Sequence, residues 1–374
     1  MRGSRRGGRR RVADGMRGWA RRWRARLAPT PGQAAVSLVL IVLLGWAAAR
    51  LFDWAVLVPW RTGGGTPASC AAGDGAGACW AVIGAQWRLI LFGLYPAASV
   101  WRAAAASGLL LGLIGVTAWV RPGLRVLAGL WPATLAASVL LLRGGVLGLA
   151  PVAEQRWGGA PLTLLLTTAG LAGAFPLAVA VALARHSARL PVVRLLAVAY
   201  VELIRGVPLI SLLFMASVML PLFLPAGMDI DKLLRAQIAF ILFAAAYLAE
   251  VVRAGLRGVP AGQAEAADAL GLSAWQKTRL VILPQALRLV IPPLLNTAIG
   301  FFKDTSLVLI IGLYDLLNAG RLAFQAPAWQ GAWREVYLFV GALYFVVCLA
   351  ASRTAAAIER RGPGEAAARG GEPA

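Results

Sequence analysis

Two pairs of ionisable residues interrupt segments that are otherwise apolar. Glu202 and Arg205 are three positions apart, and so are Glu250 and Arg253. That spacing lets both members of a pair lie on one face of a helix. A charge in an apolar span costs about 2.5–3.5 kcal/mol, so each needs a partner or a function. The pairs either hold helices together or line a path for a solute that itself carries both charges.

A third pair is made of direct neighbours, Lys303 and Asp304. Adjacent residues on a helix point in different directions, so these two need partners on other helices. The same two explanations, structural pairing or a polar lining, apply here. Spacing alone does not choose between them.

Two other features could suggest a nucleotide site or a catalytic or metal site, but the residues that such sites require are missing from the sequence. Gly271 with Lys277 and Thr278 resembles a phosphate-binding loop, but Gln276 occupies the place of the glycine before the lysine, and no strand is expected before the motif. His186 is the only histidine in the sequence, so a catalytic triad or a histidine-ligated metal centre is not expected. The sequence predicts neither a cofactor nor a metal.

The elements that carry the charged pairs are membrane spans. The chain has 374 residues, is 59% hydrophobic and only 14% charged, and has a mean hydropathy of +0.72; soluble domains carry about 25% charged residues. Several apolar runs reach the roughly 18 residues typical of a transmembrane helix. We therefore predict an all-α polytopic membrane protein with eight spans: about 34–58, 103–120, from a turn at 121–125 to about 142, 161–184, 195–224, 237–256, 284–311 and 336–351. The fifth is too long for one straight helix, and Gly206, Pro208 and Pro221 offer places to break it.

The distribution of positive charge predicts the orientation. Residues 1–26 hold eleven arginines against the single acid Asp14, and the other basic segments fall in alternate loops. The positive-inside rule places these segments and both tails, 1–33 and 356–374, in the cytoplasm. We do not expect nucleic-acid binding, because no aromatic platform or known module accompanies the arginines. The loop 59–102 then lies outside, where Cys70 and Cys79 could form a disulfide; Cys348 lies in the last span.

A polar interval, residues 258–284, separates the sixth and seventh spans. Glu265 to Leu270 favours a helix, and Gly271 supplies the left-handed residue that commonly ends one. Ser273 and Gln276 have the spacing of a capping box that starts the next piece. The interval is therefore predicted to be a helix-turn-helix elbow on the cytoplasmic side.

The elbow resembles the cytoplasmic EAA loop of ABC importer permeases. The resemblance rests on Glu265-Ala266-Ala267, on Gly271 after three intervening residues, and on Ile282-Leu283-Pro284. Surrounding motifs look like the polar amino acid branch of that family over residues 161–355: Tyr200 to Pro208, Ala249-Glu250, Pro260 to Gln263, Leu283 to Arg288, Pro292-Pro293 and Lys303 to Leu307. The three extra spans of residues 34–155, the N-terminal extension, are similar to the longer permease subunit of general L-amino acid importers.

This resemblance implies a type-1 importer core of five helices in a bacterial inner membrane, and a division of labour among subunits. A periplasmic binding protein would deliver an L-amino acid, this chain and a different permease would form the path, and two copies of an ATP-binding subunit would supply the energy. The chain itself would not be an enzyme. The expected ATPase-coupling residues are Glu265, Ala266, Ala267, Gly271 and Leu272, and the expected pathway residues are Glu202, Arg205, Gly206, Pro208, Lys303, Asp304, Thr305 and Ser306.

Three other classes remain as alternatives. A secondary, ion-coupled amino acid transporter also uses broken helices and charges at mid-membrane, but it would work without ATP and needs no docking elbow. A membrane-embedded enzyme would need a catalytic or metal cluster. A channel or structural subunit is the third alternative, and tracer uptake with and without ATP separates all of them.

Overall fold

A computed structural model describes residues 30–62, 77–120, 122–146, 148–186, 190–225, 227–228 and 230–360. The chain divides into two units at Ala81 and Val82, and each unit is described by itself. Most of both predicted tails lies outside the described residues, as does Cys70. The predicted disulfide therefore stays a prediction, while Cys79 is buried and Cys348 is a free cysteine.

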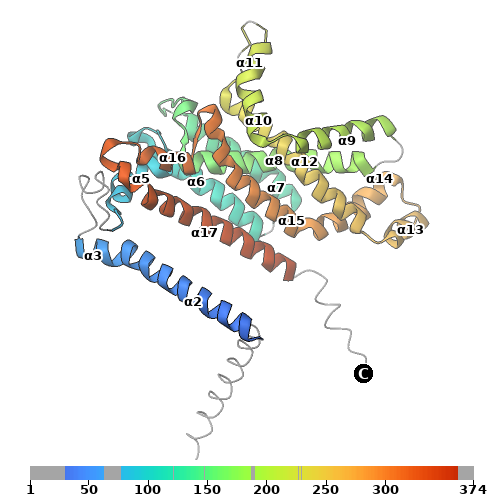
Figure 1. The fold of residues 1–374 in the computed structure, drawn as a ribbon. Coiled ribbons are helices and arrows are strands. Elements are labelled where there is room, and N and C mark those ends of the chain that lie inside the picture. Colours follow the sequence, from blue (N-terminus) through green and yellow to red (C-terminus); the bar gives the residue numbers. More distant parts are fainter. Residues whose placement is uncertain are drawn as a thin grey trace, which may run out of the picture. The chain divides into compact units, whose positions relative to one another are not determined.

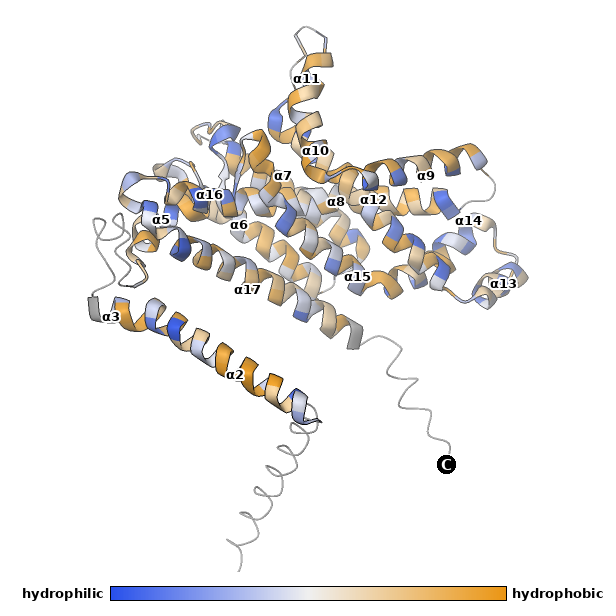
Figure 2. Cartoon of the chain, in the orientation of Figure 1, coloured by the Kyte–Doolittle hydropathy of each residue, from blue (hydrophilic) through white to orange (hydrophobic). Residues whose placement is uncertain are grey.

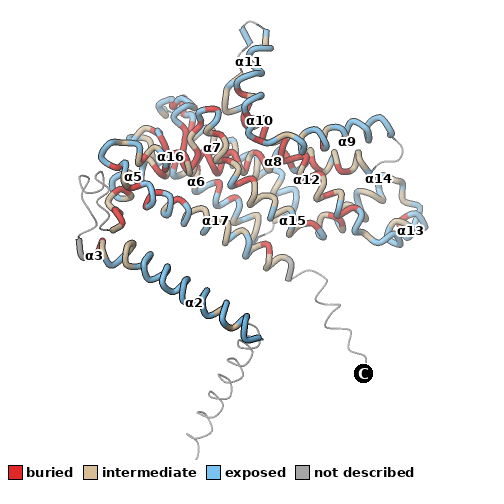
Figure 3. The backbone as a smooth tube through the Cα atoms, in the orientation of Figure 1, coloured by how far each residue is buried: buried red, intermediate tan, exposed pale blue. Residues whose placement is uncertain are grey.

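The first unit contains one long apolar helix. Thr30 caps α2 (Pro31–Phe52), its hydroxyl accepting a hydrogen bond from the N–H of Gln33 at 3.3 Å. The helix continues through a π-helical segment, η1 (Asp53–Leu57), into α3 (Val58–Thr62). Its residues are exposed along most of its length (Figure 3), and they include many large apolar ones. A helix that is apolar all round is typical of a membrane span, as predicted for residues 34–58.

The second unit begins with the rest of the N-terminal extension. A short helix, α5 (Ala81–Phe92), and the turn η2 (Ala97–Ser99) precede α6 (Val100–Gly115), η3 (Val116–Val120) and α7 (Leu124–Arg143). Helix α5 corrects the prediction of a plain loop over residues 59–102. The sequence did not predict it because its 12 residues are too few to span a bilayer, and length was the signal for the predicted spans.

A buried arginine closes the hairpin of α6 and α7. Arg102 is 1% exposed, and its guanidinium donates to the carbonyls of Leu141 and Ala150 at 2.7 and 2.8 Å. The hydroxyl of Tyr95 donates to the carbonyl of Leu142 at 2.9 Å. The last carbonyls of a helix have no partner within the helix, so these donors satisfy the end of α7.

Two long helices form the centre of the second unit. After the turn η4 (Glu154–Arg156), α8 (Gly159–His186) packs along α12 (Lys232–Gly258) (Figure 1). A buried stripe on α8 carries a small residue at every fourth position: Gly170, Ala174, Ala178 and Ala182. Small residues let the backbones of membrane helices approach closely and so gain packing energy.

The fifth predicted span is a bent pair of helices. Helix α9 (Pro191–Gly206) meets α10 (Leu209–Phe214) at an angle of 101°, and the second arm continues through η5 (Met215–Met219) and α11 (Leu220–Phe223). The cause is Pro208, which lacks an N–H and forces the preceding Val207 into an extended conformation. The break expected at Gly206 and Pro208 is confirmed.

The elbow and the last spans complete the chain. Helices α13 (Ala261–Ala269) and α14 (Ala274–Gln276) are followed by a π-helical segment, η6 (Lys277–Ile282), and by α15 (Leu283–Asp304). A 3-10 segment, η7 (Thr305–Ile311), and β1 (Tyr314–Asp315) lead to α16 (Leu316–Ala323), the turn η8 (Pro327–Ala332) and α17 (Trp333–Arg360).

The seventh span differs from its predicted start at Pro284. Residues 274–311 form one continuous helical segment, so the second half of the elbow runs into the span without a break. Pro284 was expected to begin the helix because proline has no N–H to donate. In the structure it follows the π-helical segment η6, and an irregular turn of this kind commonly accommodates a proline within a long helical segment.

The all-α fold class is confirmed. Within the described residues, seven helices are long and apolar enough to cross a membrane, and counting the bent pair as one span gives eight. Figure 2 shows apolar residues along these long helices and more polar ones in the elbow around α13 and α14.

Candidate functional site

The elbow has the local geometry that its sequence predicts. Gly271 adopts a φ of 70°, in the left-handed region. The N–H of Leu272 donates to the carbonyl of Ala267, and that of Gly271 to the carbonyl of Asp268, at 3.1 and 2.9 Å. This pair of bonds is the Schellman arrangement that ends a helix at a glycine.

Two further contacts fix the angle of the elbow. Ser273 and Gln276 form a capping box with both reciprocal hydrogen bonds present, as predicted. The ammonium of Lys277 reaches back to the carboxylate of Asp268 at 2.7 Å. An exposed ion pair of this kind contributes about 0–1 kcal/mol, so the backbone turn rather than the ion pair dominates the geometry.

The five predicted coupling residues do not share one face. Glu265, Ala266 and Gly271 are exposed, Leu272 is half-buried and Ala267 is 2% exposed. Helix α13 packs against η6, so the small side chain at 267 serves packing within the elbow. Helix α13 presents mostly small residues and two carboxylates, of which Asp268 is paired with Lys277.

Sequence reasoning missed three apolar residues that the elbow exposes. Leu270, Trp275 and Leu280 are 79%, 63% and 62% exposed. All three lie in the polar interval between spans, and large apolar residues in such an interval were the available signal. Exposed apolar groups beside polar ones mark a surface suited to a partner protein.

Glu202, Glu250 and Arg253 form one charged cluster with Arg185 across three helices. Arg185, near the end of α8, donates to Glu250 of α12 at 2.9 Å and to Glu202 of α9 at 3.3 Å. Glu250 also accepts from Nε of Arg253 at 3.0 Å. The predicted pairing of Glu250 with Arg253 is confirmed, whereas Glu202 is bonded to Arg185, which sequence reasoning placed only in a basic turn.

Arg205 is engaged differently from its predicted partner. Its guanidinium lies over the ring of Tyr247, 5.3 Å from the centroid, a favourable contact for a cation. The ring of Phe301 in α15 packs against Tyr247 in turn, with centroids 6.3 Å apart. Aromatic contacts therefore connect the charged cluster to the helix that carries Lys303.

The remaining predicted pathway residues lie in two places. Gly206 and Pro208 are exposed at the bend between α9 and α10. Lys303 is exposed and Asp304 and Ser306 are half-buried at the end of α15 and the start of η7. Thr305 is fully buried, its hydroxyl donates to the carbonyl of Phe302 at 2.9 Å, and it is also hydrogen-bonded to Tyr344 of the last helix.

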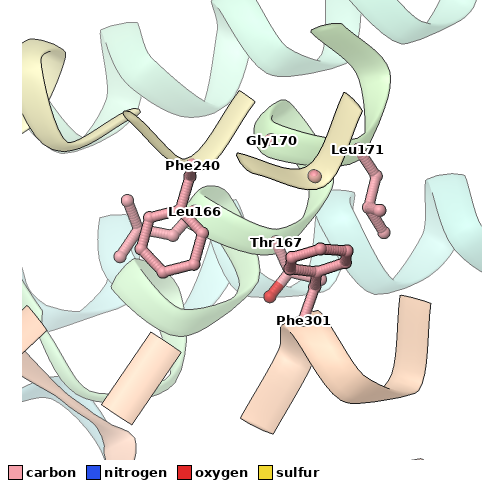
Figure 4. Close-up of a pocket in the computed structure, with 7 residues that line it drawn as sticks. Leu166, Thr167, Gly170, Leu171, Phe240 and Phe301 are labelled. Carbon is pink, nitrogen blue, oxygen red and sulfur yellow. The ribbon is translucent and has the colours of Figure 1, made fainter. Parts of the chain in front are cut away.

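A small recess between α8, α12 and α15 does not suit a charged solute. The recess is too narrow to admit a water molecule, and it is lined by Leu166, Thr167, Gly170, Leu171, Phe240, Ala244 and Phe301 (Figure 4). None of these lining residues is charged, and the only side-chain polar atom among them, the Thr167 hydroxyl, donates to the carbonyl of Thr163. The charged cluster and Lys303 are better candidates for polar contacts with a solute.

Two carboxyl groups meet where the turn η4 contacts the start of α12. Asp231 caps α12 by accepting from the N–H groups of Leu233 and Leu234, and it is hydrogen-bonded to Glu154. Burial, this hydrogen bond and the charge of Asp231 raise the pKa of Glu154 to about 7, although Arg143 acts in the opposite direction. Burial disfavours the charge on Asp231, but the hydrogen bonds from Glu154 and the backbone together lower its pKa.

The fold and the elbow define a multi-pass membrane component of a transport system, and comparison with known proteins specifies the family. Residues 174–362 match binding-protein-dependent transport system inner membrane components. The chain therefore belongs to this family and is a permease of the inner membrane.

Two relatives and one solved structure show the extent of the similarity. The chain is 45% identical over 316 residues to the inner membrane amino-acid ABC transporter permease protein YhdY of Escherichia coli K12, covering 83% of this chain and 84% of YhdY. It is 36% identical to the glutamate/glutamine/aspartate/asparagine transport system permease protein BztC of Rhodobacter capsulatus, covering 77% and 80%. The crystal structure of an amino acid ABC transporter with histidines is 33% identical, with a TM-score of 0.48 over 54% of this chain and 91% of that one.

Proposed function

We propose that this chain, together with a second and different permease, forms the path of an ATP-driven importer for L-amino acids. A periplasmic binding protein delivers the substrate, and two copies of an ATP-binding subunit dock from the cytoplasm. The observation that carries the proposal is the elbow, which has a glycine turn and a capping box and is continuous with the span that bears Lys303. Family membership and the names of YhdY and BztC support the solute class.

The elbow is suited to receive work from a partner. Its exposed helix α13 has small side chains, so a groove on another protein can approach its backbone closely. Glu265 offers a charge-assisted hydrogen bond there, and Leu270 and Trp275 offer apolar contact area. A displacement of α13 is transmitted through η6 into α15, because the turn, the capping box and the helix leave few free dihedrals between them.

The charged side chains provide the polar lining. An amino acid carries an ammonium and a carboxylate, and the exposed groups on α9 and α15 include both charges: Glu202, Arg205 and Lys303. Gly206 and Pro208 place Glu202 and Arg205 beside a bend that a movement of α9 can widen. The second permease would face the exposed side of α9, which the monomer leaves uncovered.

The proposed orientation follows from the charge pattern. Basic residues concentrate before α2, around residues 121–125, around 185–194 and in the elbow. The positive-inside rule puts these segments and both termini in the cytoplasm. The binding protein then docks at the opposite side, where η4 and β1 lie.

Uptake of labelled amino acids by proteoliposomes tests the proposal. The assembled complex should accumulate substrate only with ATP at the ATPase face and with loaded binding protein at the other face. Accumulation driven by an ion gradient without ATP would instead identify a secondary transporter. No transport of any amino acid under either condition would also contradict the proposal.

A variant pair at Gly271 isolates the role of the elbow. The space around this glycine is open, so a side chain there strains the left-handed backbone without meeting a neighbour; the strain is about 1–2 kcal/mol for most residues and smaller for Asn. Gly271→Val should lower uptake strongly while membrane insertion is kept, and Gly271→Asn should retain most uptake. Equal uptake by both variants and the wild type would remove the elbow from the mechanism.

A further inference from the structure

A buried polar network lies next to the segment that presents Lys303 and Asp304. Its centre is Asp315, which has no exposed surface. The carboxylate caps α16 by accepting from the N–H groups of Leu317 and Asn318 at 3.2 and 3.1 Å. Two further donors reach the same carboxylate: the Asn318 amide, and the Tyr344 hydroxyl at 2.9 Å.

The extra donors connect the cap to other elements. A cap requires only the two backbone bonds, whereas the amide of Asn318 also donates to the carbonyl of Ser306 at 2.9 Å. Tyr344 belongs to α17, and its ring packs on Phe302, with centroids 5.0 Å apart. The network therefore contacts the chain on both sides of Lys303 and Asp304.

The segment that the network holds is locally weak. Ser306 lies in η7, a 3-10 helix, whose hydrogen-bond geometry is poorer than that of an α-helix. The amide of Asn318 gives one of its carbonyls a fixed partner. A buried carboxylate is costly unless its hydrogen-bonding capacity is used, and a fully bonded network fixes one arrangement of the groups around it.

The start of α8 contacts the same network from the other side, and the N-terminal extension packs on α8 there. The backbone at Asp315 forms a bridge with Gly159 at the start of α8, and the hydroxyl of Thr163 accepts from the N–H of Leu316 at 2.9 Å. Gly159 packs directly on α5, since a Cβ at this position would lie 2.2 Å from the carbonyl oxygen of Leu91. Neighbouring backbones thus contact each other from α5 to η7.

We propose that Asn318 and Tyr344, acting through Asp315, are positioning residues for transport: they fix η7 and so set where Lys303 and Asp304 face the solute path. This inference rests on the proposed function. Asn318 donates to the carbonyl of Ser306. Tyr344 donates to Asp315 and so fixes the orientation of the carboxylate that accepts from Asn318. None of these three side chains needs to touch the solute.

The test measures transport per assembled complex. Tyr344→Phe removes one hydroxyl and keeps the ring on Phe302, so the fold should be retained; Asn318→Leu removes the amide at similar volume. Both variants should assemble like the wild type, keep basal ATP hydrolysis and the concentration dependence on loaded binding protein, and lose about tenfold in maximal uptake rate, since small misplacements of contacting groups have effects of this size or larger. The double variant should be no slower than Asn318→Leu alone.

The matched control is Thr168→Val, which removes a buried hydroxyl that bonds only within α8. It should leave the uptake rate per complex unchanged. If the wild type transports and either network variant matches its rate per complex, or merely assembles less, the positioning role is refuted. A wild-type complex that transports no amino acid would instead overturn the proposed function itself.

Discussion

Arg185 is the residue on which the charged cluster depends, because it bonds carboxylates from two other helices. Its side chain is 11% exposed, that of Glu250 is 26% exposed and that of Glu202 is 65% exposed. Charged hydrogen bonds strengthen as water is excluded. The bond to Glu250 should therefore stabilise the protein more than the bond to Glu202.

Double-mutant cycles test this ranking. We expect a coupling energy of about 1–3 kcal/mol between Arg185→Ala and Glu250→Ala, and about 0–1 kcal/mol between Arg185→Ala and Glu202→Ala. The measurement is the free energy of unfolding of the purified permease in detergent. His186→Ala, a change at the exposed next position, is the control and should be neutral. Equal coupling to both carboxylates would contradict the ranking.

Glu154 makes the contact between η4 and α12 dependent on pH. Its pKa in the folded protein, about 7, lies above the usual value of 4.5 for an unperturbed glutamate. Its contribution to stability is thus fully present below about pH 4.5 and is lost as the pH rises through about 7. The lowered pKa of Asp231 acts in the opposite direction at more acidic pH, below 3.8.

The predicted variant for this contact is Glu154→Gln, which keeps a hydrogen-bond donor for Asp231 at every pH. The wild type should show a melting temperature that falls between pH 5 and 7.5, and the variant should lose this fall. Gln155→Glu, a charge change at the exposed next position, serves as the control and should keep it. An unchanged pH profile in Glu154→Gln would show that the pair does not titrate in this range.

At the scale of elements, α12 and α15 approach each other closely enough that their crossing requires a glycine. A Cβ on Gly255 would lie 2.6 Å from the carbonyl oxygen of Ala286, which is backbone and cannot rotate away. Gly258, one turn later, has only a flexible leucine methyl at 3.4 Å. The elbow continues into α15. This crossing therefore fixes how α15, and the elbow with it, is placed against α12.

Alanine at these two glycines should therefore have opposite outcomes. Gly255→Ala should separate the helices and destabilise the protein by about 1–3 kcal/mol, while Gly258→Ala should be close to neutral. Thermal unfolding of both variants measures the difference. Similar melting temperatures for the two would mean that the α12–α15 crossing is looser than described.

Elements with a local chemical cause were predictable from the sequence. Gly271, the capping box and Pro208 act within a few residues, and the structure confirms the turn, the cap and the break. The spans were predictable because their length and apolar content exceed what any loop contains. The helix α5 and the early start of the seventh span were not, because short helices and π-helical segments leave no comparable pattern.

Contacts between distant residues were mostly beyond sequence reasoning. Spacing indicated that Glu250 could meet Arg253, but it could not show that Arg185, 65 residues away, would bond the same carboxylate. The Asn318 network likewise joins segments that only packing brings together. Leu270 and Trp275 were visible in the sequence as large apolar residues in a polar interval, but their exposure depends on how the elbow packs.

For the whole molecule, the proposed orientation predicts labelling from opposite sides. In Ala269→Cys and Gln155→Cys, the new thiols would lie on the exposed elbow and in the exposed turn η4. A membrane-impermeant thiol reagent applied to intact cells stripped of their outer membrane should label position 155 only. In inside-out vesicles it should label position 269 only. Labelling of the unsubstituted chain sets the background, and the reverse pattern would invert the topology.

The central claim is that the exposed surface of the elbow binds the ATP-binding subunit and transmits its conformational change to the membrane spans. The most direct measurement is ATP hydrolysis by the assembled complex, with and without loaded binding protein, for a double variant Leu270→Ser, Trp275→Ser. Its matched control is Trp119→Ser, Leu124→Ser, which changes apolar residues of similar type that are 81% and 82% exposed in the N-terminal extension. We predict that the elbow variant loses at least about tenfold of the stimulation and retains less ATP-binding subunit on purification, while the control behaves as the wild type. Full stimulation with a full complement of ATP-binding subunit in the elbow variant would contradict the account.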